Sequence, residues 1–251
     1  MSHLARKRFG QNFLVDDQIV NRIVSTISPK KSDNIVEIGP GKGALTFPLL
    51  EHLDHLSVIE IDRDLISLLK LKKQDKLTIY EADALKFDYG LISNNLRIVG
   101  NLPYNISSPL LFHLLSSKNK IIDMTFMLQK EVVDRIVAKH GSKTYGRLSV
   151  MMQTFFEVES MFTVPKESFD PQPKIESAIL YLKTRAKPLT QNTKLLEKIV
   201  KVSFSQRRKT LKNCLKSILS QEQTEIDLSQ RAEMLSIENF ITLMKDYEKQ
   251  N

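Results

Sequence analysis

The sequence has 251 residues, 41% of them hydrophobic, which is enough for one large α/β domain and a smaller second domain, each with its own core. Its 37 Lys and Arg against 29 Asp and Glu give a formal net charge of +8, which favours a polyanionic partner, although lysines on solvated helix faces would give similar totals. A single cysteine excludes an internal disulfide, and the lack of an apolar run of roughly 18 residues excludes a membrane span. We therefore expect a soluble, unprocessed, cytoplasmic protein.

The first part of the chain combines basic and aromatic residues with one amphipathic helix. Residues 6–14 are predicted to form an extended basic arm, and the following helix has Asp16 or Asp17 as its cap. From these residues alone, the arm could equally be a disordered tail with Phe9 and Phe13 docked on the domain. The apolar face of the predicted helix consists of Ile19, Val20, Ile23, Val24 and Ile27.

A glycine-rich turn follows the first strand. The predicted strand 34–38 ends in Glu37 and Ile38, and the turn Gly39-Pro40-Gly41-Lys42-Gly43 leads into a helix from Ala44 to about Leu53. Glycines let the backbone turn sharply and approach a ligand closely. The spacing G-x-G-x-G is one residue shorter than the dinucleotide fingerprint, so a cradle for pyrophosphate is the weaker interpretation. Glu37 could orient this loop or receive an ammonium group.

Acidic residues follow the next two predicted strands. Strand 55–61 ends near Glu60, 17 residues past Gly43, where a carboxylate commonly accepts hydrogen bonds from both hydroxyls of a ribose. Asp62 or Asp64 is expected to cap the next helix. Strand 77–80 runs into a loop that contains Asp83, which from spacing alone is more often an ordinary loop residue than a ligand contact.

The motif Asn101-Leu102-Pro103-Tyr104 follows the apolar run 97–100 and precedes a predicted helix at 107–117. A side-chain amide oxygen and a neighbouring main-chain carbonyl, held by the fixed φ of Pro103, can both accept hydrogen bonds from one exocyclic NH2 group. Tyr104 offers a flat face on which the ring that carries the amine can stack. A turn between strand and helix is the alternative. The position at a strand's carboxyl end, downstream of a glycine-rich turn, favours a site for an amine.

Strands and helices continue to about residue 186. We predict a buried strand at 121–129, helices at 130–138 and 147–155, and strands at 157–164 and 175–183. The loop 141–146 could close over a ligand or merely connect two helices. Near residues 185–188 the pattern changes to about four short helices, so we place a domain boundary between residues 1–186 and 187–251.

The segment 201–216 concentrates positive charge. Wound as a helix, it would place Arg208, Lys212 and Lys216 on an arc beside an apolar arc, so that one side packs and the next meets phosphate. A solvated helix face is the alternative. Its six basic residues, with no acidic residue among them, are Lys201, Arg207, Arg208, Lys209, Lys212 and Lys216.

Several of these segments resemble one protein family. Residues 37–43 and 101–104 together resemble the ribosomal RNA adenine N6,N6-dimethyltransferases that use S-adenosylmethionine. Residues 9–14 and 169–173 resemble the opening and late motifs of that family, and matching segments run from Arg8 to Asn213. Residues 204–213 resemble the branch that acts on small-subunit rRNA more than relatives that methylate large-subunit rRNA and confer macrolide resistance.

The resemblance implies a fold, a cofactor and a substrate. The expected fold is α/β, with a Rossmann-like class I methyltransferase domain containing a mixed, mainly parallel sheet, and a small all-α C-terminal domain for RNA. The expected substrate is a pair of adjacent adenines near the 3' end of 16S rRNA in an immature small ribosomal subunit. The implied cofactor contacts are Asn12, Leu14, Gly39, Gly41, Glu60, Asp83 and Asn101. The implied catalytic residues are Asn101, Leu102, Pro103, Tyr104 and Phe169, and those for RNA are Arg207, Arg208, Lys209, Lys212 and Lys216.

In this family Phe169 would stack on the adenine face opposite Tyr104, whereas a core aromatic beside a Pro-stiffened turn is the alternative. Two further function classes stay open: a non-catalytic ribosome-assembly factor that binds RNA, and an oxidoreductase with a nicotinamide cofactor. The five histidines show no ligand spacing, so we predict no metal. We also expect a monomer.

Overall fold

The computed structural model describes residues 12–250, which form two compact units. One unit takes in the chain up to Val133 together with Glu159–Thr184, and the other takes in Asp134–Val158 together with the chain from Arg185 onward. The chain crosses from the first unit to the second at Thr184/Arg185, close to the predicted boundary at 186/187. The inclusion of residues 134–158 in that unit was not expected from the sequence.

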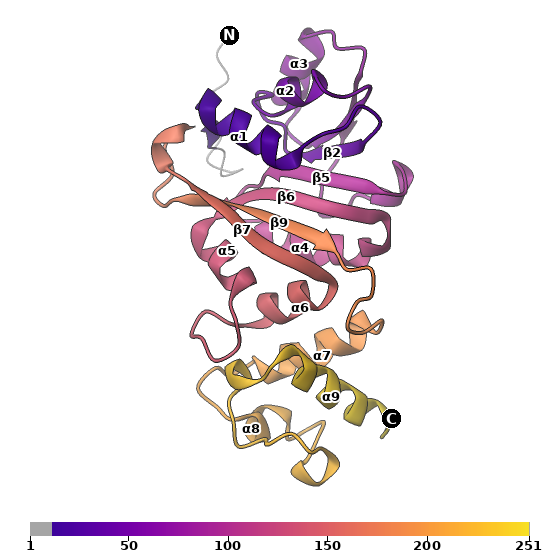
Figure 1. Ribbon diagram of the computed structural model, residues 1–251, viewed down its shortest axis with the longest axis vertical. Helices are drawn as coiled ribbons and strands as arrows, with labels where there is room; N and C mark the ends of the chain where they lie inside the picture. The colour runs from indigo at the N-terminus through magenta and orange to yellow at the C-terminus, as the bar shows by residue number, and fades with distance from the viewer. Residues whose placement is uncertain (1–11, 251) are drawn as a thin grey trace. The chain divides into compact units, whose positions relative to one another are not determined.

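A seven-stranded sheet in the order β4-β3-β2-β5-β6-β9-β7 forms the centre of the first unit. β2 pairs in parallel with β3 on one side and with β5 on the other, while β9 is antiparallel to β6 (Figure 1). The expected mixed, mainly parallel sheet is thus confirmed. The strand bounds are β2 Asn34–Ile38, β3 Leu56–Glu60, β4 Leu77–Glu81, β5 Leu96–Asn101, β6 Ile121–Gln129, β7 Phe156–Val164 and β9 Ser177–Thr184.

Local capping explains where two helices of this unit begin. Asp16 accepts hydrogen bonds from the backbone N–H of Gln18 and Ile19 at the start of α1 (Asp17–Ile27), and Asp62 accepts one from Asp64 at the start of α3 (Arg63–Leu71). The helix predicted at about 44–53 is confined to α2, Thr46–Leu50, because the preceding residues form turns. α4 spans Ser107–Ser116.

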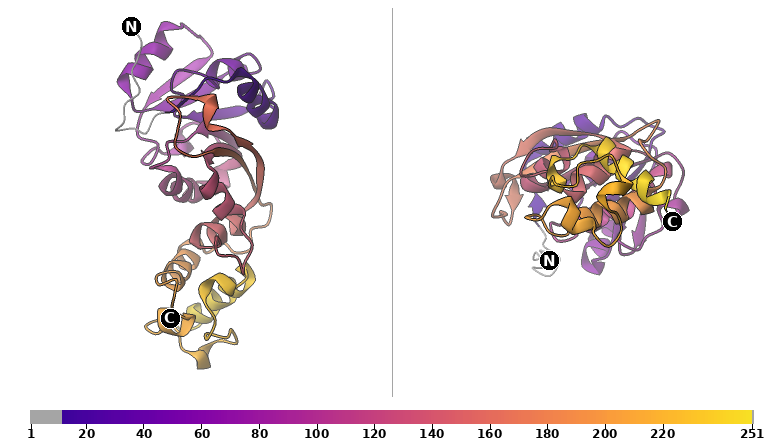
Figure 2. Two further views of the ribbon diagram at one scale, coloured as in Figure 1. Left: turned by 90° about the vertical axis from the view of Figure 1, so that its left-hand side faces the viewer. Right: turned by 90° about the horizontal axis from the view of Figure 1, so that it is seen from below.

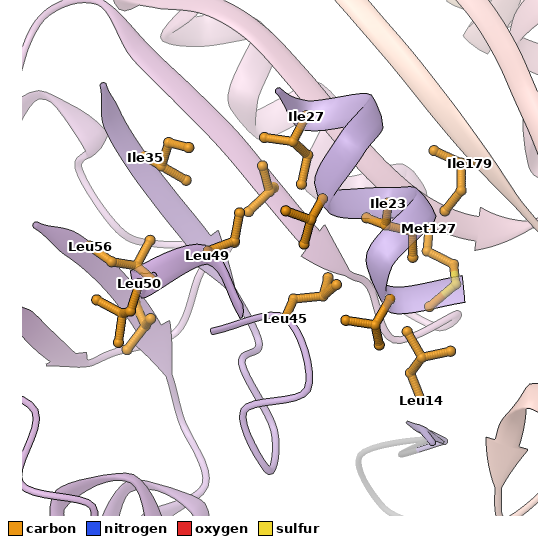
Figure 3. Close-up of a cluster of buried hydrophobic side chains, with 14 of the residues drawn as sticks. Leu14, Ile23, Ile27, Ile35, Leu45, Leu49, Leu50, Leu56, Met127 and Ile179 are labelled. Atoms are coloured by element: carbon orange, nitrogen blue, oxygen red, sulfur yellow. The ribbon is translucent and has the colours of Figure 1, made fainter. Parts of the chain in front are cut away.

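The core of the first unit joins helices to the sheet. Ile23 and Ile27 of α1 and Leu49 of α2 pack in one apolar cluster with Ile35 of β2, and Met127 and Ile179 bring β6 and β9 into it (Figure 3). These side chains are buried, so their removal from water stabilises the arrangement of the strands whose carboxyl ends carry the predicted site residues.

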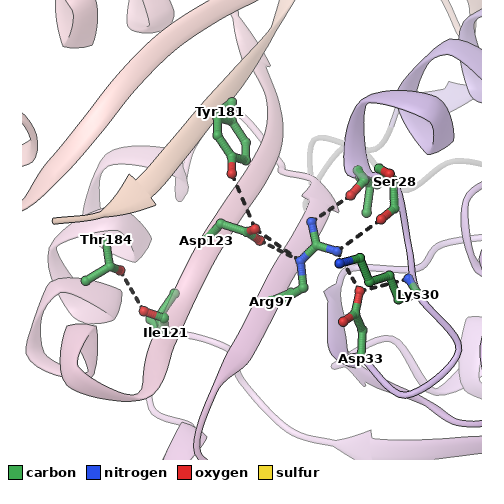
Figure 4. Close-up of polar contacts among 9 residues, drawn as sticks. Ser28, Lys30, Asp33, Arg97, Ile121, Asp123, Tyr181 and Thr184 are labelled. Carbon is green, nitrogen blue, oxygen red and sulfur yellow. Dashed lines mark hydrogen bonds and ion pairs between the residues drawn. The ribbon is translucent and has the colours of Figure 1, made fainter. Parts of the chain in front are cut away.

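Arg97 ties α1 to two strands at the opposite end of β5. Its Nε donates to Asp123 at 3.0 Å and its Nη1 to Asp33 at 2.6 Å, while its guanidinium also donates to the carbonyls of Ile27 and Ser28 (Figure 4). The fork of the guanidinium thus satisfies two carboxylates and the end of a helix at once.

Removal of this guanidinium is expected to destabilise the fold. In Arg97→Ala the carboxylates of Asp123 and Asp33 lose their cationic partner in a mostly buried place, so the free energy of unfolding should fall by about 3 kcal/mol. Arg63→Ala is the matched control, because Arg63 and Glu81 form an exposed pair of similar length that should cost less than about 1 kcal/mol. Urea denaturation measures both values, and equal losses would contradict the assignment.

The second unit is mostly helical. α6 (Arg147–Phe155) contacts α7 (Thr193–Ser203) and α9 (Ile237–Glu248), which explains why a segment distant in sequence belongs to this unit. α5 (Lys130–Val137) leads into this unit. α7 contacts both α8 (Leu211–Leu215) and α9, and these three helices are the orange and yellow segments in Figure 2. In the part of the chain that the structure describes, no helix is long and apolar enough to cross a membrane.

The single helix predicted over 201–216 is wrong. α7 ends at Ser203, residues 204–210 form turns, and α8 begins at Leu211. The backbone N–H groups of Leu211 and Lys212 donate to the carbonyls of Gln230 and Leu228, both at 2.8 Å, instead of to the preceding turn of a helix. Pairing with a distant segment therefore interrupts the helix, and the predicted arc of Arg208, Lys212 and Lys216 does not form.

Candidate active site

A cavity of about 320 Å³ opens at the carboxyl ends of the strands in the first unit. It lies where the strand order reverses, because β3 and β4 extend from β2 to one side and β5 and β6 to the other. Its volume suits a ligand of nucleoside size. The predicted site residues in its lining are Asn12, Leu14, Gly39, Gly41, Glu60, Asp83, Asn101, Leu102, Pro103 and Tyr104.

The segment before α1 forms one wall of this cavity. β1 (Phe13–Leu14) pairs antiparallel with β8 (Phe169–Asp170), the N–H of Val15 donates to the carbonyl of Ser168 at 2.9 Å, and Ser168 Oγ donates to Asp16 at 2.9 Å. Phe13 is buried, as expected from the alternative in which the aromatic side chains of this segment dock on the domain. The predicted basic arm at 6–11, with Phe9, lies outside the described residues.

The glycine-rich turn meets that wall at Gly41. Gly41 has a φ of +58°, a conformation that side chains with a Cβ rarely adopt, and a Cβ there would lie 3.3 Å from the ring of Phe13. Lys42 Nζ lies 4.4 Å from the centre of the same ring. The turn and the N-terminal strand therefore approach each other as closely as they do because position 41 has no side chain.

Two buried carboxylates stand beside the turn. Glu37 is 2% exposed and accepts a hydrogen bond from Thr46 Oγ1 at 2.6 Å. Glu60 accepts hydrogen bonds through Oε1 from the backbone N–H of Ile61 at 2.8 Å and Asp62 at 2.9 Å, which fixes its direction. Burial raises the pKa of both groups, that of Glu37 to about 7 with a further contribution from the charge of Glu60.

The pKa of Glu37 predicts a pH-dependent stability. Because the folded pKa is raised from 4.5 to about 7, the folded state binds the proton more tightly, so its stability should fall as pH rises from 4.5 through 7, by about 3 kcal/mol in total. Glu37→Gln keeps the acceptor for Thr46 and removes the charge, so it should abolish this part of the pH dependence. Denaturation of both proteins at pH 5 and pH 8 measures the difference. Parallel pH profiles would contradict it.

Apolar side chains complete the lining and were missed from the sequence. Ile61 is 51% exposed and Val15 57% exposed, although both are large and hydrophobic, and Leu65 and Leu85 also line the cavity. Such exposure at a cavity suits the flat face of a base or a ligand's aliphatic part. Ile61 could have been found, because it follows Glu60 directly at the end of a strand.

Asp83 lies in the lining as the resemblance implies, and it also has a local role. Its Oδ1 accepts a hydrogen bond from the N–H of Leu85 at 3.0 Å, which shapes the loop after β4. This hydrogen bond fits the interpretation of Asp83 as an ordinary loop residue, and its contact with a cofactor stays a prediction.

The Asn101 side chain is oriented by the N-terminal wall. Its Nδ2 donates to the carbonyl of Asn12 at 3.1 Å, and within residues 12–250 no donor reaches its Oδ1. The N–H of Leu102 donates to the carbonyl of Met127 in β6 at 3.1 Å, whereas the carbonyl of Leu102 accepts from no described donor. Two oxygen acceptors are therefore left on consecutive residues of the lining.

The two aromatic residues of the predicted site differ in their surroundings. Tyr104 is half-buried in the lining, and its hydroxyl lies 2.9 Å from Ser177 Oγ. Phe169 is 3% exposed, pairs through its backbone with Leu14, and belongs to the apolar core rather than to the cavity lining of the described residues. Its side chain is placed as the core-aromatic alternative expects, and stacking by Phe169 stays a prediction.

The basic residues predicted to contact RNA lie in the second unit. Arg207, Arg208 and Lys209 are exposed on the turn between α7 and α8, and Lys212 and Lys216 are exposed in and after α8. Arg207 Nη2 donates to the carbonyl of Lys143 at 2.5 Å, so this turn lies against the loop 141–146. That loop is anchored where Tyr145 packs against Phe204 with ring centres 6.2 Å apart.

Within residues 12–250, no group of three His, Cys, Asp or Glu side chains could hold a metal ion.

Comparison with known proteins decides the family. The model of a family described as ribosomal RNA adenine dimethylase matches residues 2–249. The chain belongs to this family. Among its relatives, the ribosomal RNA small subunit methyltransferase A of Methylobacillus flagellatus is 53% identical, with 97% of this chain and 98% of that protein covered. The protein of the same name from Dechloromonas aromatica is 51% identical, with 96% and 97% covered. The resemblance inferred from the motifs is therefore confirmed.

Solved structures share the fold over almost the full length. A dimethyladenosine transferase from Plasmodium falciparum is 27% identical with a TM-score of 0.82 and covers 95% of this chain and 98% of its own. The 23S rRNA methyltransferase ErmE is 26% identical with a TM-score of 0.74 and covers 94% and 100%. The expected class I methyltransferase fold is confirmed.

Proposed function

We propose that this chain transfers methyl groups from S-adenosylmethionine to the N6 amines of two adjacent adenines near the 3' end of small-subunit rRNA. The observation that carries this proposal is the pair of acceptors, Asn101 Oδ1 and the Leu102 carbonyl, in the lining of a cavity that also contains the glycine-rich turn. Family membership and the names of relatives at about 50% identity support the reaction and the choice of rRNA.

The lining residues fit S-adenosylmethionine. Glu60 offers a fixed carboxylate for ribose hydroxyls, and the glycine turn allows close passage of a ligand backbone without a Cβ in the way. Ile61 and Val15 present apolar surface for a flat ring, and Glu37 stands near the turn for an ammonium group. When bound, S-adenosylmethionine supplies an electrophilic methyl group.

The chain's own residues account for the activation of the amine. The lone pair of adenine N6 is delocalised into the ring, which makes this nitrogen a poor nucleophile. Hydrogen bonds from its N–H groups to Asn101 Oδ1 and the Leu102 carbonyl favour rehybridisation and stabilise the positive charge that develops there. A strong base is not needed, because the alkylated nitrogen loses a proton readily. A monomethylated amine keeps one N–H, so the same acceptors permit a second transfer.

Tyr104 and the basic turn supply binding of the RNA. The ring of Tyr104 stacks on an adenine turned out of its helix, and the resemblance to the family assigns the other face of the base to Phe169. Arg207, Arg208, Lys209, Lys212 and Lys216 contact phosphates. We assign methyl transfer to residues 1–186 and RNA binding to residues 187–251, in a monomeric cytoplasmic enzyme that acts on an immature small subunit.

Methylation with labelled S-adenosylmethionine tests the function. The protein is incubated separately with small-subunit and large-subunit rRNA and with immature small subunits, and the modified base is then mapped. Label at adenine N6 in small-subunit rRNA is the expected result. Label in large-subunit rRNA alone would favour the macrolide-resistance branch, and saturable cofactor binding without transfer would favour a non-catalytic assembly factor.

A further inference from the structure

Tyr104 makes a polar contact across a long distance in sequence. Its hydroxyl lies 2.9 Å from the Oγ of Ser177, 73 residues later in the chain. Ser177 is the first residue of β9, is fully buried, and pairs in the sheet opposite Gln129 of β6. The hydrogen bond therefore joins the free end of a ring in the cavity lining to a buried residue at the start of β9, which pairs with β6 in the sheet.

Other contacts hold the backbone of this segment without holding the ring. Leu102 donates to the carbonyl of Met127 at 3.1 Å, and Ser107 Oγ donates to the carbonyl of Pro103 at 3.1 Å. Neither bond restricts rotation about the side-chain torsions of Tyr104. Within the described residues, Ser177 is the hydrogen-bond partner of the phenol. Burial raises the pKa of Tyr104, so the phenol stays protonated and keeps this bond at neutral pH.

We infer that Ser177 is a positioning residue for methyl transfer, because it holds the Tyr104 ring at the angle at which a base stacks beside the acceptors of Asn101 and Leu102. This inference rests on the proposed function of Tyr104. Ser177 acts through that ring and not by contact with the base. Preorganisation of a flat platform restricts the base to poses in which its amine meets both acceptors.

The assignment also gives residues 169–177 a part in the site. Phe169, the aromatic residue of the late motif, is packed in the core, but the same segment leads into β9 and delivers Ser177 to the ring of Tyr104. In this conformation the segment contributes to the site through the hydroxyl of Ser177, which lies outside the motif at 169–173.

A double-mutant cycle on the full chain tests the inference. Ser177→Ala and Tyr104→Phe remove the same hydrogen bond from its two ends, so each should lower kcat about three- to tenfold, and the double variant should be no slower than either single variant. The dissociation constant for S-adenosylmethionine, measured by calorimetry, should change less than about twofold, because the affected group is the platform for the base. Unmethylated small ribosomal subunits serve as substrate.

A matched control separates this effect from loss of any buried hydroxyl. Thr125 lies in β6, next to β9, and its buried Oγ1 has no hydrogen-bond partner within residues 12–250. Thr125→Val should therefore leave kcat unchanged while it also removes one hydroxyl from the sheet. A loss of kcat in Thr125→Val as large as that in Ser177→Ala would overturn the inference, since disturbance of the sheet would then explain both.

Two further outcomes would overturn it. Multiplied losses in the double variant would mean that Ser177 and Tyr104 act independently. Unchanged kcat in Tyr104→Phe would mean that the hydrogen bond does not position the ring, and this measurement stands even if Ser177→Ala does not fold.

Tyr104→Ala keeps this inference distinguishable from the proposed function. It should lower kcat/KM by about 10- to 100-fold through loss of the stacking platform. Full activity of Tyr104→Ala would overturn the stacking role itself. A strong loss in Tyr104→Ala together with wild-type kcat in Tyr104→Phe would leave the stacking role standing and would overturn the role of Ser177 alone.

Discussion

Replacement of Asn101 by alanine is expected to lower the rate of rRNA methylation by about 100- to 1000-fold, the usual cost of removing one preorganised partner of a charge that develops in the transition state. The variant loses Oδ1, the acceptor that no described donor occupies, while the carbonyl of Leu102 remains. The effect should be in kcat, because the acceptor matters most when positive charge develops on the amine. Single-turnover methylation with labelled S-adenosylmethionine measures the rate.

The controls separate chemistry from cofactor binding. Calorimetric titration of Asn101→Ala should show an S-adenosylmethionine affinity that falls by less than about tenfold, much less than the rate, because Asn101 is one of several implied cofactor contacts and Glu60 and the glycine turn are unchanged. Asn21→Ala removes an exposed asparagine from α1 and should have no effect on either value. Wild-type methylation by a folded Asn101→Ala protein would rule out the role assigned to this amide.

Replacement of Glu60 by alanine is expected to weaken S-adenosylmethionine binding by about 10- to 100-fold, since hydrogen bonds to a charged group contribute about 1.5–3 kcal/mol. The direction of this carboxylate is fixed by the N–H groups of Ile61 and Asp62, so the Glu60 side chain loses little conformational entropy when it binds a ribose. Calorimetry measures the affinity. At saturating cofactor, the methylation rate should largely recover, because Glu60 is not one of the acceptors for the amine.

Glu60→Gln refines this test. It keeps a side-chain oxygen for the two backbone donors and removes the charge, so its affinity should fall between those of the wild type and Glu60→Ala. Glu81→Gln is the matched control, because Glu81 ends the neighbouring strand β4 but is exposed and pairs with Arg63 at 2.8 Å. An equal loss of affinity in Glu81→Gln would mean that general charge near the sheet edge, and not contact with the ribose, explains the result.

Much of the first unit could be predicted because its signals are local. The caps of α1 and α3, the strands at 34–38 and 121–129, and the glycine turn all depend on residues within a few positions of each other. The carboxyl ends of parallel strands meet at one edge of a sheet, which brings Glu60 and Asn101 to one cavity, whereas a place for Asp83 there was implied only by the resemblance to the family.

Where the structure differs from what local patterns indicate, the physical cause is contact with distant segments. The periodicity at 201–216 fits a helix, but the backbone of Leu211 and Lys212 bonds to residues 228–230 instead. Residues 134–158 join the second unit because α6 packs against α7 and α9. The core environment of Phe169 likewise follows from the pairing of β8 with β1. A strand of two residues is too short to be predicted from its sequence pattern.

By itself, the sequence determined the family, the type of sheet and several residues of the cavity lining, though not its apolar side chains, because motif spacing and strand periodicity are properties of short segments. Only the tertiary structure decided how those residues are held. Asn12 orients the amide of Asn101 across 89 positions, and Ser177 meets the phenol of Tyr104 across 73. These contacts arise when the fold brings together segments that are far apart in the chain, and no local pattern of residues encodes such an arrangement.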